Sequence, residues 1–396
     1  MSNIVTGIDI GSYQVKVVIA ERADDPRQLP HILGTGYAES RGLKHGYVIS
    51  VPDVARSVAA AVAQASKAAG HKVERACIGI GGIGLDEAFS HGEAAVERGD
   101  SEITERDVAR AIAASEKAVP PAAITNKKIL HTIPLSFSVD GARILGKNPA
   151  GMKGSRVSVD TFLITCLDRH VADILSAVDE AGIEVEDIAA SPMAASFVSL
   201  SKMQKRVGCI LANIGSETMS TIVYEDTIPV SIKVFPVGGN DITNDLALGM
   251  RIALEEAEQL KHGAVLGAPY PKRKIDDLIS KRLTDMFKLI DAHLKSINKD
   301  ELLPAGIVMT GGSSVIPLSA DLAKSILRLP SRAATLTDGS SDPSLPHDSS
   351  WSVAYGLTIW GDSQRGATEP FGGNGVKDMV TDAAGNIWRW FKKFLP

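Results

Sequence analysis

Apolar and polar positions follow two different periods along this chain. Apolar runs such as Ile4–Ile10 and residues 77–80 have the length and composition of buried strands. Residues 51–69 instead repeat apolar side chains at helical spacing, with Val54 and Val58 on one face. Strand-like and helix-like stretches alternate through most of the sequence, and this alternation predicts an α/β fold.

One short segment occurs twice. Residues 7–12 (GIDIGS) are echoed by residues 211–216 (LANIGS), and each copy is followed by a second apolar run. Two such strand-turn-strand units predict two facing phosphate clamps. The copies differ at one position, where the acidic Asp9 of the first corresponds to the neutral Asn213 of the second.

The first copy carries groups suited to a metal-bound phosphate. Gly11 has no side chain to block a phosphate, so the turn exposes its backbone N–H groups and the Ser12 hydroxyl. Asp9 could hold waters around Mg²⁺, and Lys16 on the return strand adds a positive charge. A carboxylate followed by Gly-Ser at a strand end is also typical of an ordinary hairpin turn.

The region between the two hairpins contains a predicted insert at residues 84–161. Thr104 begins a helix-like run and residues 129–139 have the pattern of a strand, which indicates a small α+β unit. Further elements are predicted at residues 162–167, 170–181, 209–224, 306–309 and 320–327, with a long helical region at 244–262 and 275–297. Residues 331–350 are typical of an exposed loop, and residues 361–375 of a tether.

Three further groups of residues bear on nucleotide binding. Gly311 and Gly312 follow a strand, so a flat ring or a phosphate could approach the backbone there, although a double glycine is also an ordinary turn. Glu258 and Lys261 share one helix face, where they could bind ribose hydroxyls or form a surface ion pair. Residues 238–240 precede a helix start and suit either an anion or a helix N-cap.

Composition narrows the class of protein. The net charge is −5 and the basic residues are dispersed, which argues against a nucleic-acid partner. Polar residues interrupt the N-terminal apolar run, so neither a signal peptide nor a membrane span is predicted there. Cys77, Cys166 and Cys209 lie in apolar strand-like runs without metal-type spacing, which predicts buried reduced thiols of a cytoplasmic protein.

The order of these motifs resembles that of the actin-like ATPases, in which two related lobes clamp a nucleotide. Over nearly the whole chain the sequence is similar to FtsA, the bacterial cell-division actin; the matching segments are 103–108, 129–134, 139–141, 148–154, 237–243 and 308–312. The resemblance implies ATP and Mg²⁺ as cofactors, with Asp9 holding the metal through water. The nucleotide-binding residues expected on this basis are Asp9, Gly11, Ser12, Tyr13, Lys16, Asn213, Gly215, Ser216, Glu217, Thr218, Gly238, Gly239, Asn240, Glu258, Lys261, Gly311, Gly312 and Ser313.

The resemblance also predicts a division into subdomains. The first lobe (1A) is expected at residues 1–83, 162–206 and 351–361, the FtsA-type insert (1C) at 84–161, the second lobe (2A) at 207–245 and 303–350, and its helical subdomain (2B) at 246–302. A linker at 362–375 and an amphipathic membrane-targeting helix at 376–396 complete the chain.

The last twenty residues have the pattern of a helix that lies on a membrane surface. At 100° per residue, apolar side chains occupy one face and charged or polar ones the other. The segment is terminal, its aromatics crowd at the end, and its basic residues suit anionic lipid, although such a face is more often core. The candidate membrane-binding residues are Val376, Met379, Val380, Ala383, Ile387, Trp388, Arg389, Trp390, Phe391, Lys392, Lys393, Phe394 and Leu395.

Partners follow from the same resemblance. An FtsA-like protein is expected to polymerise with itself on the inner face of the cytoplasmic membrane, and to recruit the C-terminal peptide of the tubulin-like FtsZ together with other divisome proteins. Residues 279–285 resemble a helix of the peptide-binding subdomain, so Arg282 is a candidate for pairing with an acidic peptide or is an exposed arginine on a solvated helix.

Three departures from the family pattern predict slow or absent ATP hydrolysis. Asn213 stands where actin-like ATPases carry a second carboxylate, Ser191 where FtsA relatives commonly carry Glu, and Ser216 and Glu217 where two glycines are usual. Two alternatives stay open. A PilM-like pilus adaptor shares the core but normally lacks a basic tail, and a small-molecule kinase would need a carboxylate base, for which Asp241 is the nearest candidate.

Overall fold

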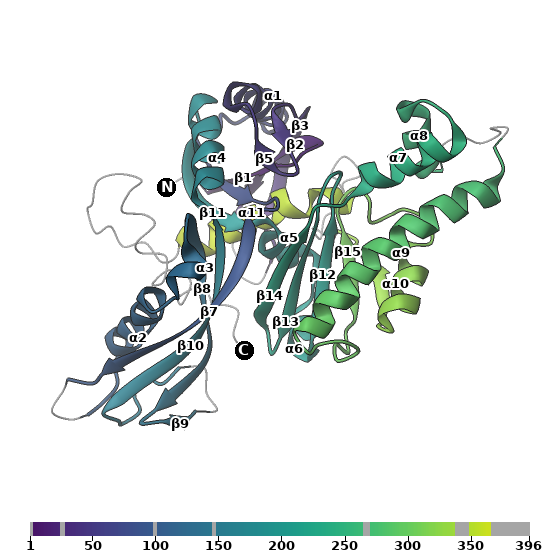
Figure 1. Ribbon diagram of the computed structural model, residues 1–396. Helices are drawn as coiled ribbons and strands as arrows, with labels where there is room; N and C mark the ends of the chain where they lie inside the picture. The colour runs from purple at the N-terminus through teal and green to yellow at the C-terminus, as the bar shows by residue number, and fades with distance from the viewer. Residues whose placement is uncertain are drawn as a thin grey trace.

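The computed structural model describes residues 3–23, 28–97, 101–144, 148–263, 270–336 and 348–365. These residues form two lobes, each built on a five-stranded sheet, and a smaller unit that projects from the first lobe at the lower left of Figure 1. The predicted membrane helix at 376–396 lies outside the described residues, and so do all its candidate membrane-binding side chains.

The first sheet has the strand order β11-β6-β1-β2-β3. Its strands are β1 (Ile4–Ile10), β2 (Gln14–Glu21), β3 (His31–Glu39), β6 (Arg75–Ile80) and β11 (Glu184–Ala190). β1 is antiparallel to β2 and parallel to β6. Helix α1 (Val51–Ala69) packs on β3, and Gly36 permits this, because a Cβ there would lie 2.2 Å from the carbonyl oxygen of Ala61.

The second sheet repeats this pattern. Its order is β14-β13-β12-β15-β16, with β12 antiparallel to β13 and parallel to β15. The strands are β12 (Cys209–Ile214), β13 (Met219–Glu225), β14 (Ile228–Phe235), β15 (Ile307–Thr310) and β16 (Ser331–Ala333). β1 and β12 therefore hold the same place in the two sheets, and the prediction of two related lobes is confirmed.

Two hydrophobic cores join these elements. Alternate residues of β12 face opposite sides: Leu211 belongs to a core shared with Ile8 and Ile78 of the first lobe, whereas Ile210 belongs to a core under helix α9 (Lys272–Ser296). Helices α5 (Ser191–Ser199) and α11 (Ser352–Arg365) lie between the sheets and contact each other (Figure 1). Burial of each large apolar side chain contributes roughly 1.5 to 3 kcal/mol. The three cysteines are buried in the structure, as expected.

The small unit is an α+β insert, as predicted. Strands β7 (Leu85–Ala95), β10 (Arg156–Leu167), β8 (Lys127–Val139) and β9 (Ala142–Arg143) form one sheet, with α2 (Glu105–Lys117) packed on β7 and α3 (Pro121–Ile124) beside β8. Thr104 caps α2, since its hydroxyl accepts from the N–H of Asp107 and the Asp107 carboxylate accepts from the N–H of Thr104. β10 is one continuous strand, so the boundary expected at 161–162 falls inside it.

The region expected to be helical at 244–262 is helical, with a break at residues 251–253. Helix α7 (Gly239–Met250) ends at Arg251, whose φ of 62° is left-handed, and α8 (Leu254–Lys261) starts in a new direction. The sequence analysis did not predict this break, although Gly249 lies two residues before it. At the other end, α11 runs to Arg365, into the range predicted as linker.

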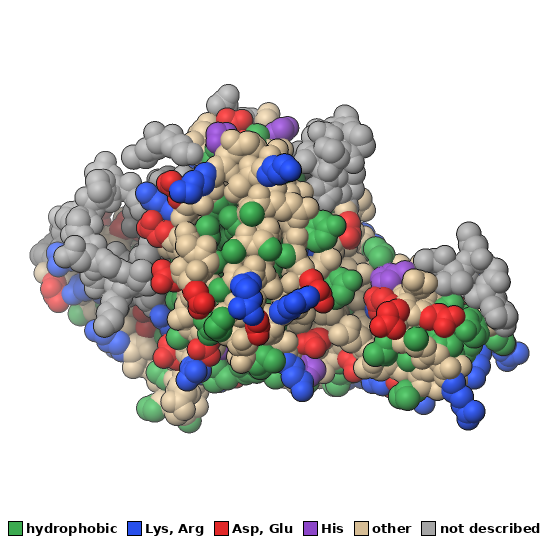
Figure 2. Space-filling model, turned by 90° about the horizontal axis from the view of Figure 1, so that it is seen from above, with side chains coloured by type: hydrophobic (Ala, Val, Ile, Leu, Met, Phe, Trp, Pro, Cys, Tyr) green, Lys and Arg blue, Asp and Glu red, His purple; other side chains and the backbone are tan. Residues whose placement is uncertain are grey.

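The remaining elements lie between those already named. They are β4 (Leu43–Lys44), β5 (Tyr47–Val48), α4 (Asp168–Glu180), α6 (Lys202–Val207), α10 (Ser319–Leu327) and a 3-10 turn at Ser349–Trp351. None of the helices in the described part of the chain combines the length and the apolar character needed to cross a membrane. Figure 2 shows charged side chains of both signs interspersed over the face seen from above.

Candidate functional site

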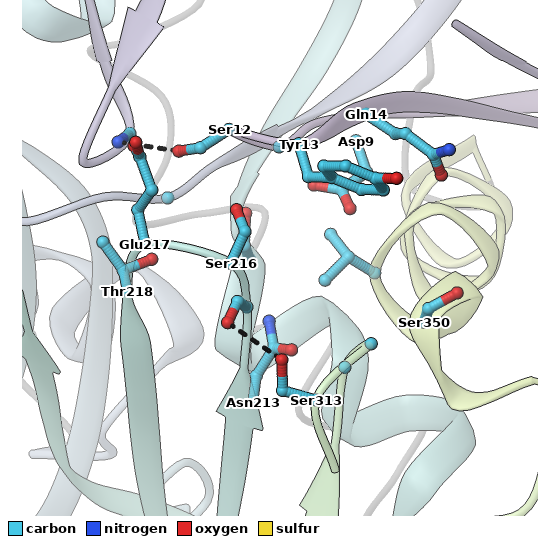
Figure 3. Close-up of a pocket in the computed structure, with 18 of the residues that line it drawn as sticks. Asp9, Ser12, Tyr13, Gln14, Asn213, Ser216, Glu217, Thr218, Ser313 and Ser350 are labelled. Carbon is cyan, nitrogen blue, oxygen red and sulfur yellow. Dashed lines mark hydrogen bonds between the residues drawn. The ribbon is translucent and has the colours of Figure 1, made fainter. Parts of the chain in front are cut away.

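A cleft lies where the two repeated hairpins face each other. It holds a cavity of about 200 Å³ that is open to solvent and is lined by residues of both lobes. All the residues expected to bind nucleotide line this cleft, except Gly238 and Gly239. In Figure 3 the side chains of Asp9 and Tyr13 lie on one side of the opening and those of Asn213 and Ser313 on the other.

The two hairpins close with the same backbone geometry. In the first turn (residues 11–14) the N–H of Gly11 donates to the carbonyl of Gln14 over 3.2 Å. In the second turn (residues 215–218) the N–H of Gly215 donates to the carbonyl of Thr218 over 2.9 Å. Each turn follows the central strand of its sheet, and the two turns line the same cleft.

The first hairpin places opposite charges on neighbouring strands. Asp9 on β1 is the direct cross-strand partner of Lys16 on β2. Burial raises the pKa of Asp9 to about 6, and the nearby Lys16 ammonium offsets part of this rise. Burial lowers the pKa of Lys16, and its Nζ donates to the carbonyl oxygen of Ser350 over 3.2 Å. A cation beside Asp9 would stabilise its ionised form, and Mg²⁺ with its waters fits this requirement.

The second hairpin carries neutral groups at the same register. Asn213 on β12 pairs across the strands with Ser220 on β13. Gly311 has a φ of 89° and packs against the Asn213 amide, since a Cβ there would lie 2.4 Å from its Oδ1. The Ser313 hydroxyl donates to the carbonyl of Gly215 over 3.5 Å (Figure 3). The loop after β15 is thus tied to the second turn.

Glu258 and Lys261 form an ion pair at one end of the cleft. The Lys261 Nζ donates to Glu258 Oε2 over 2.6 Å and to the Thr243 hydroxyl over 2.9 Å, and its side chain is only 3% exposed. Burial favours a higher pKa for Glu258, but hydrogen bonds from His262, Lys261 and Thr243 lower it to about 2. The pair is therefore not on the open surface, and its carboxylate, 41% exposed, faces the cleft.

The backbone N–H groups at the start of α7 donate to oxygen atoms of the protein. The N–H of Gly238 donates to the Asp241 carboxylate over 2.8 Å, which is the N-cap arrangement. The N–H groups of Gly239 and Asn240 donate to the carbonyls of Gly215 and Ser216 over 2.9 and 2.7 Å. The amides considered for an anion thus hold the second turn in place, and a role for Gly238 and Gly239 in nucleotide binding stays a prediction.

The cleft also contains residues that the sequence analysis did not select. Gly81 and Gly82 follow strand β6 as Gly311 and Gly312 follow β15, so the same double-glycine signal could have found them. The others are Ile10, Gln14, Gly46, Ser220, His262, Ser349, Ser350 and Val353, and Ser191 also lines the cleft. No motif marks Gly46 or Ser350, because tertiary packing alone brings them to the cleft.

Arg282 lies away from this cleft on α9. Its Nε and Nη2 donate to the two carboxylate oxygens of Asp245 on α7 over 2.7 and 2.9 Å. This bidentate pair joins the two helices of the second lobe. An acidic peptide would have to compete with Asp245, so contact between Arg282 and FtsZ stays a prediction.

Comparison with known proteins gives the same fold and a family. The solved PilM-PilN type IV pilus biogenesis complex aligns with a TM-score of 0.66 and 17% identity, covering 90% of this chain and 98% of that one. MreB 5 of Spiroplasma citri bound to AMPPNP aligns with a TM-score of 0.53 and 11% identity, covering 92% and 98%. These likenesses confirm the actin-like fold.

Sequence comparison is more specific. The family model for cell division protein FtsA matches residues 210–356, and the model for the SHS2 domain inserted in FtsA matches residues 87–165. Cell division protein FtsA of Enterococcus hirae is 30% identical over 349 residues, which cover 82% of this chain and 76% of that protein. This chain therefore belongs to the FtsA family of cell division proteins.

Proposed function

We propose that this protein binds ATP with Mg²⁺ between its lobes. The observation that carries the proposal is the convergence of the two glycine turns on one cleft, with Asp9 and Lys16 side by side at its floor. The cleft has room at the double glycine as well: a Cβ on Gly312 would have no neighbour closer than 4.0 Å. The residues present fit a metal-bound nucleotide.

In this proposal each part of the cleft has its own task. The Lys16 ammonium and the backbone N–H groups of the two turns hold the phosphates, apart from those of Gly11 and Gly215, which close the turns. Asp9 orients waters on Mg²⁺, which supplies positive charge against the phosphates. Glu258 and the Gly311–Gly312 backbone suit the ribose and the base.

Hydrolysis is proposed to be slow. Asn213 can hydrogen-bond to a water but cannot carry the negative charge of a second carboxylate. Ser191, at the start of α5, lines the cleft where FtsA relatives commonly have Glu, and a hydroxyl is a poor general base. The nucleotide then serves mainly to shape the protein for self-association.

The further proposal is that filaments of this protein recruit FtsZ to the inner face of the cytoplasmic membrane through residues 376–396. The sequence pattern of the tail supports this, with its aromatics and its basic Arg389, Lys392 and Lys393. One such helix binds weakly, since ordering it costs about 1 to 2 kcal/mol per residue. Many tails on one filament bind firmly through effective concentration, which couples polymerisation to attachment.

Co-sedimentation with anionic liposomes tests this proposal. The full chain should sediment with liposomes more strongly with ATP and Mg²⁺ than without, and a chain ending at Gly375 should not. Exchanging Trp390 and Phe391 for charged residues should release the protein while leaving nucleotide binding intact. Equal sedimentation of the full and shortened chains would overturn the role of the tail.

A pilus-assembly adaptor is the second candidate. The likeness to the PilM-PilN complex, with its TM-score of 0.66, favours it. The FtsA family matches and the basic tail favour the first candidate. Binding of the protein to an FtsZ C-terminal peptide, measured by fluorescence anisotropy, separates the two.

A further inference from the structure

A short turn of the first lobe lies at the mouth of the cleft and contacts both lobes. It joins β4 to β5 at His45 and Gly46, and the N–H groups of these two residues donate to acceptors in different lobes. The N–H of His45 donates to Glu217 Oε2 of the second lobe over 2.6 Å. The N–H of Gly46 donates to the Ser12 hydroxyl of the first lobe over 3.1 Å.

The turn itself is fixed to the first lobe. Gly46 packs directly on Gly82, since a Cβ at residue 46 would lie 2.4 Å from the Gly82 Cα. The N–H of Ile83 donates to the carbonyl of His45 over 3.4 Å, and the Tyr47 ring meets His170 edge to face at 5.1 Å. The contact between His45 and Glu217 is therefore a contact between the lobes rather than within one.

Glu217 is oriented toward this turn and not toward the centre of the cleft. In Figure 3 its side chain extends from the second turn to the point where the Ser12 hydroxyl bonds to Gly46. A second contact holds the same residue, because Nδ1 of His45 lies 3.2 Å from the Glu217 carbonyl oxygen. A carboxylate that pointed into the cleft would repel a phosphate. The hydrogen bond from the His45 N–H instead holds the Glu217 carboxylate at the mouth of the cleft.

We propose that Glu217 is a latch that holds the lobes together across the mouth of the cleft and sets how fast nucleotide enters and leaves. The inference rests on the proposed nucleotide binding. It gives Glu217 a positioning role in place of the direct nucleotide contact expected from its place in the second turn. A ligand passing the mouth must wait for the hydrogen bond to His45 to open, so the latch slows uptake and release alike.

Stopped-flow measurement with a fluorescent ATP analogue tests the latch on the full chain. Glu217→Ala should raise both the association and the dissociation rate by about fivefold to tenfold, which lies within the range for losing one ordinary intramolecular hydrogen bond. The dissociation constant should change less than the rates. Glu217→Gln keeps an oxygen acceptor and should restore most of the slow exchange. The matched control is Glu301→Ala, which removes a surface glutamate paired with Arg328.

A faster dissociation alone, with an unchanged association rate, would make Glu217 a ligand contact and overturn the latch. Unchanged rates would overturn it as well. Hydrogen exchange of the His45 and Gly46 amides in the nucleotide-free protein gives an independent readout. Glu217→Ala should speed exchange at His45 by about fivefold to tenfold, and equal exchange would contradict the latch. If the unaltered chain binds no nucleotide, the proposed function fails, and the exchange experiment still decides whether the lobes are latched.

Discussion

The two hairpin turns share the same backbone geometry but lie beside strand residues of different charge. Both follow the central strand of a sheet with the same strand order, and both close with one N–H to carbonyl bond. At the same register the first hairpin pairs Asp9 with Lys16, whereas the second pairs Asn213 with Ser220. The repeated fold thus supplies the position of the two turns, and the side chains give each turn its own chemistry.

Because of this difference, we expect the two lobes to have separate tasks. The first turn concentrates charge on the floor of the cleft, where burial makes that charge sensitive to a bound cation. The second turn has no charge at the equivalent strand positions, and its one carboxylate, Glu217, reaches across to the first lobe. Binding a metal and holding the lobes together are therefore expected to respond to different substitutions.

The largest effect is expected from making the first hairpin like the second. Asp9→Asn should lower the affinity for ATP in the presence of Mg²⁺ on the order of 100-fold, the upper range for a group that orients metal-bound ligands. Without Mg²⁺ the affinity should change little. Titration calorimetry with and without Mg²⁺ checks this. Asn213→Ala is the matched control, and an equal loss in both variants would show that the hairpins are equivalent.

The reverse exchange should increase turnover. Combining Asn213→Asp with Ser191→Glu supplies both carboxylates that actin-like relatives carry, and the hydrolysis rate should rise roughly 30-fold, below the range of about 10²–10⁴ for an optimised general base. Phosphate release under single-turnover conditions measures it. A rate that stays at the level of the unaltered chain would show that these two positions do not limit hydrolysis.

Because the Asp9 carboxylate is buried, we also expect Mg²⁺-dependent affinity for ATP to depend on pH through the first hairpin and not through the second. Since the pKa of Asp9 is about 6, its ionised fraction falls about tenfold between pH 7 and pH 5, and Mg²⁺-dependent affinity should fall with it. The ratio of affinities between the unaltered chain and Asp9→Asn removes the titration of the phosphate. A ratio that is constant with pH would contradict the role of Asp9.

The Asp9 carboxylate also makes the free energy of unfolding depend on pH, with a sign opposite to that of most carboxylates. Its pKa is 3.8 in the unfolded chain and about 6 in the fold, so the folded protein binds more protons between these values. The contribution of Asp9 to the free energy of unfolding therefore decreases as pH rises from about 4 to about 6. Asp9→Asn should remove this decrease in a urea titration series.

Much of this comparison could be predicted from the sequence, because each hairpin is a local pattern of apolar runs around a glycine turn. Asp9 and Asn213 were identifiable from alignment of the two copies alone. The contact between His45 and Glu217 was not, since it joins residues far apart in the chain through a backbone N–H that carries no sequence signal. The burial of Lys261 was missed for a similar reason: helical spacing predicts the pair with Glu258, but only the packing of α7 and α8 removes its ammonium from solvent.

The smallest effect separates the return strands of the two hairpins. Lys16→Gln should weaken ATP binding by roughly fivefold, because it removes a positive charge near the phosphates. The effect is limited because the Lys16 ammonium already donates to the Ser350 carbonyl. Ser220→Ala at the equivalent position should change affinity by less than about twofold, since a neutral hydroxyl contributes little to phosphate binding. Affinity measured at two salt concentrations decides the cause: the effect of Lys16→Gln should shrink at high salt, where charges are screened, and that of Ser220→Ala should not. Equal losses at both positions would mean that the two strands contribute through packing, and the charge difference between the hairpins would then have no bearing on nucleotide affinity.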